Sequence, residues 1–419
     1  MSSAPLPTSS RATGSSVFAV RDFRIYLIST FVGNVAINAQ SVAVGWQVYK
    51  ITGSPLSLGY VGLMQFLPLM VMTLPAGTIA DRFDRRLIMA ISACARALIA
   101  VTFVALSIAS PHVIWPYYVT LVVFGAVRAF AAPAGDALLP RLVAPERFSE
   151  AVAWSSSSGQ LSFITGPAVG GALYLLGPVA TYSVCAVLFL VSATGIALIR
   201  PLAAAAPARA LGLAELTVGV TYVRAHAIIL GSISLDLFAV LLGGAAALFP
   251  VYARDILHVG PAGLGVLRSS PALGATIMGL LLGRTPLRRN SGPIMFGCVA
   301  MFGLMVIVFG LSRNFALSIA ALVVMGMADM VSVYVRRTVL QLATPDRMRG
   351  RVSAVDRLFV SASNELGSFE SGVTADWFGT VPSVVIGGIG TLLVVATWWR
   401  LFPELGAVDD LYEVKPIGD

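Results

Sequence analysis

Residues 77–86 read GTIADRFDRR, and this charged segment separates two long apolar stretches, residues 57–79 and 87–109. A helix that crosses a membrane needs about 20 mostly apolar residues, because lipid offers no partner for a free backbone N–H or C=O. Each flanking stretch is long enough to cross a bilayer. The segment is therefore predicted to be a short loop at the membrane surface, between two transmembrane helices.

The same pattern extends along the whole chain. Of its 419 residues, 57% are hydrophobic and 11% are charged, whereas soluble proteins carry about 25% charged residues. The sequence thus predicts an all-α membrane protein with twelve transmembrane helices. These are expected near residues 24–49, 57–79, 87–109, 113–133, 152–176, 179–199, 227–252, 262–283, 291–311, 315–335, 352–377 and 380–402.

The positive charges indicate the orientation of these spans. The net charge is +8, and cytoplasmic loops of membrane proteins carry an excess of Lys and Arg. Of the 28 basic residues, 22 fall on or near one side, 3 on the other (Lys50, Arg254, Arg313) and 3 within spans (Arg96, Arg128, Arg268). This split predicts cytoplasmic N- and C-termini, and it explains the net charge without a nucleic-acid partner. The excess of 26 Arg over 2 Lys favours a bacterial source, and hence the inner membrane.

The longest polar interruption, residues 200–226, divides the spans into two sets of six. Pro145, Glu146, Arg147 and Val152 after the fourth span match Pro345, Asp346, Arg347 and Val352 after the tenth, at a constant offset of 200 residues. Such a repeat predicts two six-helix bundles. The expected parts are a disordered cytoplasmic tail 1–22, a bundle 23–200, a linker 201–226 with an amphipathic helix, a bundle 227–403 and a cytoplasmic tail 404–419.

The loop GTIADRFDRR resembles the cytoplasmic signature of the major facilitator superfamily. The matching residues are Gly77, Asp81, Arg82, Arg85 and Arg86, and Asp84 replaces the family's second glycine. An acidic residue there is similar to the branch that contains enterobactin and drug exporters. Stretches beginning at Phe23, Ala247 and Leu340 resemble that branch as well. The resemblance implies the major facilitator fold and a transport function.

In this family the signature latches the cytoplasmic ends of the two bundles together. The resemblance implies that Asp81 pairs with a residue such as Arg128 and with the start of the eleventh span near Arg351. Glycine at position 77 would permit close helix approach. Alternatively, the three arginines of the loop act only as determinants of topology.

The fifth span contains SFITGPAVGGAL, residues 162–173. It resembles a Gly-Pro-x-x-Gly-Gly signature of the superfamily's antiporters, with Ser162 where a further glycine would be expected. The matching residues are Gly166, Pro167, Gly170 and Gly171. Gly166 and Gly170 form a GxxxG face for close helix packing, and Pro167 removes a backbone hydrogen bond. The pattern favours export over import.

Ionisable side chains inside the bilayer are functional candidates, since each costs at least ~3 kcal/mol to insert. They are Arg96, Arg128, Asp236, Arg268, Asp329, Glu365 and Glu370. Asp236 and Glu365 lie nearest the midplane and are predicted to exchange protons, with Arg96 and Arg268 also on the translocation pathway. A structural ion pair between Asp236 and Arg268 is the alternative. Asp329 and Arg128 are expected to serve structure between the bundles.

Uncharged polar residues also occur at membrane depth. Asn34, Asn38, Gln65 and Gln160 are predicted to line the pathway, and hydrogen bonds between helices are the alternative. Asn34 and Asn38 are four residues apart and therefore share a helix face.

Three functions fit these features. The first is a proton-driven exporter of small organic molecules, drugs or siderophores, working as a monomer in the lipid bilayer without a cofactor or metal. The second is an exporter of a metal cation such as nickel, which the three scattered histidines disfavour. The third is a non-transporting sensor or scaffold. No ATP-binding Gly-rich motif and no catalytic triad is present, so the chain is not expected to be an enzyme.

Overall fold

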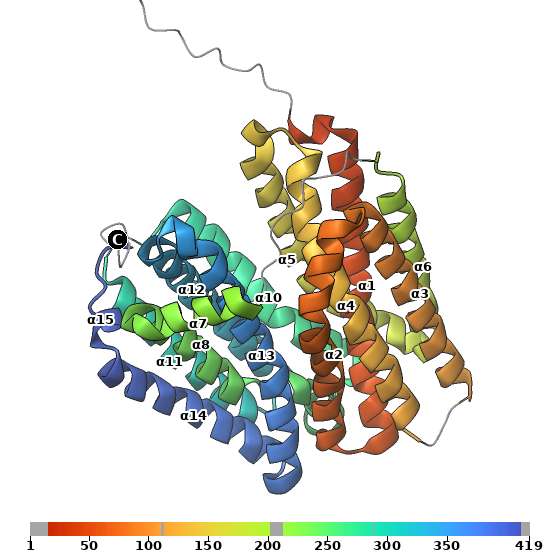
Figure 1. The fold of residues 1–419 in the computed structure, drawn as a ribbon. Coiled ribbons are helices and arrows are strands. Elements are labelled where there is room, and N and C mark those ends of the chain that lie inside the picture. Colours follow the sequence, from red (N-terminus) through yellow and green to blue (C-terminus); the bar gives the residue numbers. More distant parts are fainter. Residues whose placement is uncertain (1–15, 110–112, 202–212, 288, 412–419) are drawn as a thin grey trace, which may run out of the picture.

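The computed structural model describes residues 16–109, 113–201, 213–287 and 289–411, and within these ranges its regular structure consists of helices (Figure 1). The α-helices are α1 (Arg21–Thr52), α2 (Pro55–Arg82), α3 (Arg85–Ala109), α4 (Trp115–Leu142), α5 (Phe148–Leu173), α6 (Pro178–Ala197), α7 (Leu213–Ala225), α8 (Ala227–Gly243), α9 (Phe249–Val251), α10 (Gly260–Arg284), α11 (Ser291–Leu311), α12 (Phe315–Ala343), α13 (Asp346–Phe378), α14 (Thr380–Leu401) and α15 (Pro403–Gly406).

Ten segments of the described chain are long and apolar enough to cross a membrane. The expected fifth and eleventh spans, α5 and α13, are 26 and 33 residues long but fall outside this set. Both are rich in polar residues, and both pack against the other half of the molecule. A helix shielded from lipid by protein needs a less apolar surface than one surrounded by lipid.

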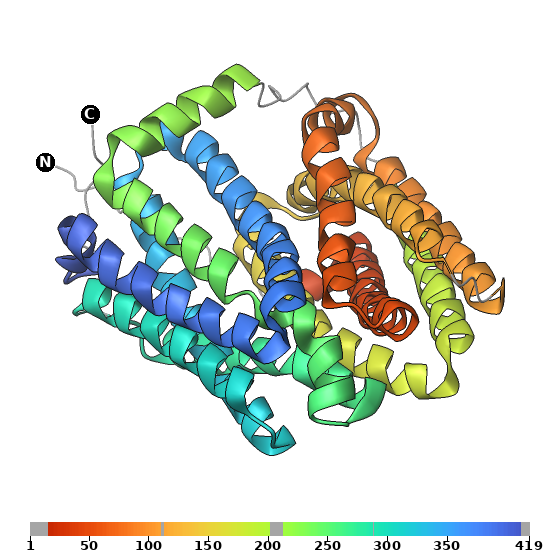
Figure 2. The same ribbon diagram turned by 90° about the horizontal axis from the view of Figure 1, so that it is seen from below.

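The helices form two bundles, α1–α6 and α8–α14, which meet along two seams (Figures 1 and 2). One seam is α5 against α10, and the other is α2 against α13. We call the side where α1 begins and α14 ends the terminal face, and the side where α1 ends and α2 begins the distal face. In Figure 1 the bundles approach each other near the distal face and diverge toward the terminal face.

The expected seventh span, residues 227–252, is interrupted. Its first part, α8, ends at Gly243, and Gly244 leaves helical geometry with φ −74° and ψ 64°. A 3₁₀ turn (Ala245–Leu248), α9 and a π-helical turn (Tyr252–Ile256) complete the crossing. Two adjacent glycines weaken the helix, and Pro250 cannot donate a backbone hydrogen bond. The Ser371 hydroxyl of α13 donates to the Gly244 carbonyl at 2.9 Å.

The linker helix α7 packs on α13 and α8, and it buries Val223 beside Val352 and Val355. Residues 202–212 of the expected linker lie outside the described chain. Both ends of the chain are docked where they are described. The expected disorder of residues 1–22 is wrong for residues 17–22, because Val17–Ala19 forms a 3₁₀ turn on Glu150 and α1 begins at Arg21.

The C-terminal segment after α14 packs against the start of α11. Leu405, Val408 and Leu411 are buried there. Backbone N–H groups of Asn290 and Ser291 donate to Asp409, so this segment caps the N-terminus of α11.

Candidate transport cavity

A cavity of about 780 Å³ lies between the two bundles. This volume lies within the range of about 300–1,000 Å³ that small-molecule sites occupy. The N-terminal bundle contributes α1, α2, α4 and α5 to its wall, and the C-terminal bundle contributes α8, α10, α11, α12 and α13. Aromatic rings of Phe124, Phe163, Phe249 and Phe302 alternate with amide and charged side chains. The cavity is therefore amphipathic, and both bundles form its wall.

The four amides predicted for the pathway all line this cavity: Asn34, Asn38, Gln65 and Gln160. Asn38 donates to the Asn34 carbonyl at 2.9 Å, and Gln65 donates to Val61 at 3.0 Å, so both are anchored within their own helices. The alternative, a bond between helices, holds for Gln160, which donates to the Ala272 carbonyl of α10 at 3.1 Å. Gln160 thus lines the cavity and also joins the bundles.

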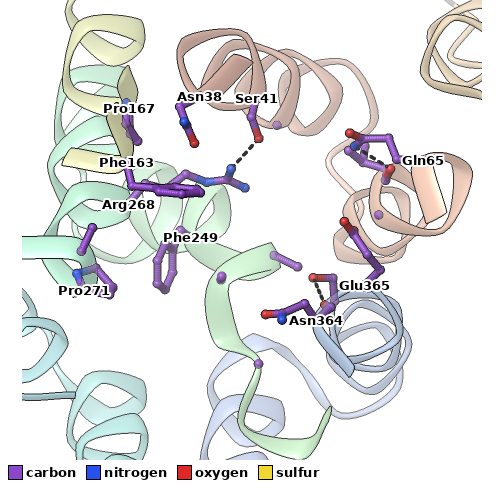
Figure 3. A pocket seen from close by; sticks show the side chains of 18 of the residues that line it. Asn38, Ser41, Gln65, Phe163, Pro167, Phe249, Arg268, Pro271, Asn364 and Glu365 are labelled. Atoms are coloured by element: carbon purple, nitrogen blue, oxygen red, sulfur yellow. Dashed lines mark hydrogen bonds between the residues drawn. The ribbon is translucent and has the colours of Figure 1, made fainter. Parts of the chain in front are cut away.

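Arg268 projects from α10 across the cavity toward α1 (Figure 3). Its Nη1 donates to the Ser41 hydroxyl at 2.7 Å, and Phe163 and Phe249 lie beside it. Its Nε is buried with no hydrogen-bond partner in the described chain. The expected ion pair between Arg268 and Asp236 is wrong, since Arg268 points into the cavity and Asp236 does not.

Asp236 forms its ion pair with Arg336 of α12, inside the C-terminal bundle. The two side chains are only 10% and 5% exposed. Asp236 lines a small cleft with Asp329 and Ser332, and it is not among the residues that line the main cavity. The prediction that Asp236 lines the pathway is thereby corrected: it faces α12, because its depth along α8 said nothing of the direction in which it points.

Glu365 of α13 forms an ion pair with Arg128 of α4 at 3.2 Å, and both line the cavity. This pair joins the two bundles at mid-height, which gives Arg128 a partner other than Asp81 in this conformation. Arg96 on α3 is absent from the cavity lining, and its Nε is buried without a hydrogen-bond partner in the described chain. Its expected place on the pathway is therefore corrected to one within the N-terminal bundle.

Three features of the wall were not predicted. Asp329, which was expected to serve structure between bundles, lines the cavity from α12. Asn364 lies beside Glu365 on α13 (Figure 3). The interrupted segment 243–247 also forms part of the wall. The Gly-Gly pair followed by Pro250 was the sequence signal that could have revealed this interruption.

The loop GTIADRFDRR makes bonds within the N-terminal bundle in this conformation. Arg85 donates to the Ala137 carbonyl at 3.3 Å, and Arg86 donates to the Ile199 carbonyl at 2.6 Å. Arg82 is exposed, and the side chain of Asp81 lies outside the described atoms. A Cβ on Gly77 would meet nothing within 4 Å, so the close helix approach predicted at this glycine is absent here.

Arg351, the expected latch partner at the start of α13, lies 3.8 Å from Glu215 of the linker helix α7. Both residues belong to the C-terminal side of the molecule. The latch between the bundles stays a prediction for a conformation in which the terminal ends of the bundles meet.

The glycines of α5 have two distinct contacts. Gly166 and Gly170 face α1, where added Cβ atoms would lie 2.5 Å from the Asn38 Cβ and 2.6 Å from the Ala39 Cα. Gly171 faces α10 of the other bundle, where a Cβ would lie 2.5 Å from the Pro261 carbonyl oxygen. The Pro167 carbonyl meets Gly265 of α10 in the same way. One helix thus packs closely within its own bundle and across the seam.

The second seam uses glycines as well. A Cβ on Gly372 of α13 would lie 2.8 Å from the Cα of Gly59 on α2. A third contact joins α1 to the turn that follows α9: the Tyr49 hydroxyl donates to the Asp255 carboxylate, and Arg254 lies 5.5 Å over the Tyr49 ring. We call Tyr49, Arg254 and Asp255 the distal clasp. All these contacts join the bundles in their distal halves.

Removing the Tyr49 hydroxyl is expected to loosen the distal face. A Tyr49→Phe variant loses a hydrogen bond to a half-exposed carboxylate, which is worth about 1 kcal/mol, or roughly fivefold in the closed-to-open ratio. Spin labels on Leu176→Cys and Trp377→Cys, which are exposed on opposite bundles, would report a larger population of long distances. Tyr118→Phe is the matched control, because Tyr118 bonds Ser57 within one bundle; an equal shift in the control would contradict the clasp.

Two helical bundles around a shared amphipathic cavity, with polytopic apolar helices, define a transporter of the major facilitator class. A family model described as "Transmembrane secretion effector" matches residues 12–412, and the chain belongs to this family. It is therefore a multi-pass protein of the bacterial inner membrane and not an enzyme. These relationships show the family and the general activity of export transport.

Named relatives and solved structures agree with this assignment. The chain is 25% identical over 394 residues to the enterobactin exporter EntS of Citrobacter koseri, covering 91% of this chain and 92% of that one. It is 26% identical over 383 residues to EntS of Shigella dysenteriae serotype 1, covering 89% of each. The fold resembles an inward-facing bacterial homologue of Spinster (TM-score 0.74, 14% identity, 94% and 99% covered). It also resembles an inward-facing bacterial homologue of ferroportin (TM-score 0.68, 14% identity, 94% and 100% covered).

Proposed function

We propose that the protein exports small organic molecules, drug-like or siderophore-like, across the inner membrane by alternating access, in exchange for protons. Twelve spans with both termini in the cytoplasm are part of the proposal. The terminal face is then cytoplasmic, and the structure represents the inward-facing conformation, with its distal seams closed. The positive charges of the sequence favour this orientation.

The observation that carries the proposal is the Arg128–Glu365 ion pair across the cavity. Each bundle contributes one charge to a site that a bound molecule must also occupy, so cargo that engages either charge alters the contact between the bundles. Alternating access requires such a link between occupancy and bundle contact. A wall of phenylalanines, amides and charged side chains of both signs suits an amphipathic organic molecule.

A metal cargo has weaker support. The described residues contain no group of three or more His, Cys, Asp or Glu side chains placed to hold a metal ion. Two carboxylates, Glu365 and Asp329, line the cavity together with Arg128 and Arg268, and a guanidinium repels a cation. The relatives named as enterobactin exporters point to an organic cargo instead.

Proton exchange is expected to be visible directly. Inside-out membrane vesicles that contain the protein are energised to acidify their interior, and enterobactin or ethidium is then added outside. Cargo uptake by antiport carries protons out, so a fluorescent pH indicator should report loss of the gradient in these vesicles and none in vesicles from cells lacking the protein. Uptake of cargo with no proton movement would exclude antiport; uptake of neither compound would count against organic export.

A further inference from the structure

Asp329 lies where the main cavity joins the small cleft around Asp236. It lines both spaces. On α12 it shares a face with Met325, four residues before it, and with Ser332 and Arg336, three and seven residues after it. Met325 lines the main cavity, Ser332 lines the cleft, and Arg336 is paired with Asp236. One face of α12 therefore leads from the cavity to the buried ion pair.

Asp329 has no hydrogen-bond or ion-pair partner in the described part of the chain, and most of the charged groups near it bind other residues. Glu365 has Arg128 and Asp236 has Arg336, whereas Asp329 makes no hydrogen bond and no ion pair with a described residue. From α10, Arg268 enters the same cavity but bonds Ser41. From α11, the cleft receives only the apolar Val299 and Phe302. Arg337, exposed on α12, is the remaining cation whose charge acts on Asp329.

An unpartnered carboxylate can be solvated while its cavity is open to water. When the cavity closes and water leaves, the group needs either a proton or a counter-ion. Arg336 lies seven residues from Asp329 on the same face of α12. Helical Cα–Cβ bonds tilt toward the N-terminus, so the guanidinium of Arg336 can reach toward Asp329 without a change of helix position. Arg336 is already held by Asp236, and the charge of Asp356 on α13 acts on it as well. A deprotonated Asp329 would therefore compete with other carboxylates for one guanidinium.

We propose that Asp329 is the carboxyl that binds and releases the transported proton, and that the neighbouring Asp236–Arg336 pair is its charge partner. The inference rests on the proton antiport proposed above. In the open cavity a hydronium ion transfers a proton to one Asp329 carboxylate oxygen: one O–H bond of the hydronium breaks as the carboxyl O–H bond forms, and a water molecule is left. Release is the reverse step, in which water takes the proton and the carboxylate is restored. With the proton bound, Arg336 stays with Asp236. With the proton released, Arg336 is shared between the two carboxylates, and the α8–α12 contact changes with it.

This assignment distinguishes the proton-binding carboxyl from the ion pair that joins the bundles. Glu365 and Arg128 join the bundles across the cavity. Asp329 lies on the cavity wall, and the Asp236–Arg336 pair near it belongs to the C-terminal bundle alone. Asp236, the earlier candidate, becomes a positioning residue that acts through Arg336.

The test compares Asp329→Asn with Asp376→Asn, a control that removes an exposed carboxyl near the distal end of α13. Asp329→Asn should still exchange labelled cargo between equal pools at equal pH, with enterobactin or ethidium as the probe. It should lose cargo-induced proton movement and accumulation driven by a pH gradient, at least about tenfold. Asp376→Asn should keep both. Cargo-induced proton movement within about twofold of wild type in Asp329→Asn would overturn the assignment.

A second measurement needs no cargo. Infrared spectroscopy of the purified protein follows the carbonyl band of protonated carboxylic acids while the pH is changed. The wild type should show a titrating band that Asp329→Asn removes and Asp376→Asn keeps, and an unchanged band in Asp329→Asn would overturn the assignment. If wild-type vesicles showed no proton movement with either cargo, the proposed antiport itself would be contradicted. That result differs from one in which the wild type moves protons and Asp329→Asn does so equally well, which contradicts only the assignment of Asp329.

Discussion

A Gly171→Val variant is expected to fold and insert normally but to transport at less than about a tenth of the wild-type rate, since overpacking costs ~1–3 kcal/mol and 1.4 kcal/mol is tenfold. The added side chain would meet backbone atoms of α10, where even a Cβ lies 2.5 Å from the Pro261 carbonyl and 3.0 Å from the Gly265 Cα. Backbone cannot rotate away as a side chain can. The seam between α5 and α10 therefore has to open, and the conformation with closed distal seams is destabilised.

The control for this variant lies on the same helix. Gly159 has nothing within 4 Å of an added Cβ, so Gly159→Val changes helix propensity equally without touching the other bundle. Spin labels on Leu176→Cys and Trp377→Cys should show a wider distal separation in Gly171→Val and the wild-type separation in Gly159→Val. Wild-type transport by Gly171→Val would show that the α5–α10 contact is not needed for closure.

The architecture could be predicted from the sequence because the membrane restricts the choices. Spans of about 20 apolar residues and the sided distribution of arginines left little freedom in the helix order. The amides Asn34, Asn38, Gln65 and Gln160 were predicted from depth alone, and all four lie at the cavity wall. An amide facing lipid would be costly, so depth was enough to indicate an inward direction.

The charged residues could not be placed in this way. Successive residues turn by about 100° around a helix, so depth does not tell which neighbour a side chain faces once several helices surround it. Asp236 and Asp329 line the same small cleft, yet Asp236 is paired with Arg336 and Asp329 also lines the main cavity. Arg336 was assigned to a loop because the tenth span was ended at residue 335, whereas α12 continues to Ala343. An ion-pair partner outside the expected span could not be considered.

Reversing the charge of Glu365 is expected to have the second large effect. Two ion pairs join α4 and α13: Arg128 with Glu365 at 3.2 Å, and Asp136 with Arg357 at 3.5 Å. The pairs are eight residues apart on each helix, about 12 Å at 1.5 Å per residue, and their signs are opposite. Glu365→Arg would place two cations together in the cavity, and transport should fall roughly tenfold or more, because coupling between contacting residues reaches 0.5–3 kcal/mol.

A double reversal distinguishes the ion pair from other uses of Glu365. Arg128→Glu with Glu365→Arg restores opposite charges across the seam, and we expect it to recover much of the transport lost in either single variant. A role of Glu365 in contacting cargo through its own carboxylate predicts no recovery, because the carboxylate would then stand on the wrong helix. The outer pair supplies the comparison: Asp136 and Arg357 are 76% and 68% exposed, so water screens their attraction and the corresponding reversals should each change transport by less than about threefold. Charge reversal at the Asp136–Arg357 pair could instead reduce transport as much as reversal at the Arg128–Glu365 pair. That result would mean that transport requires the register of α4 against α13 and not the charge at the cavity.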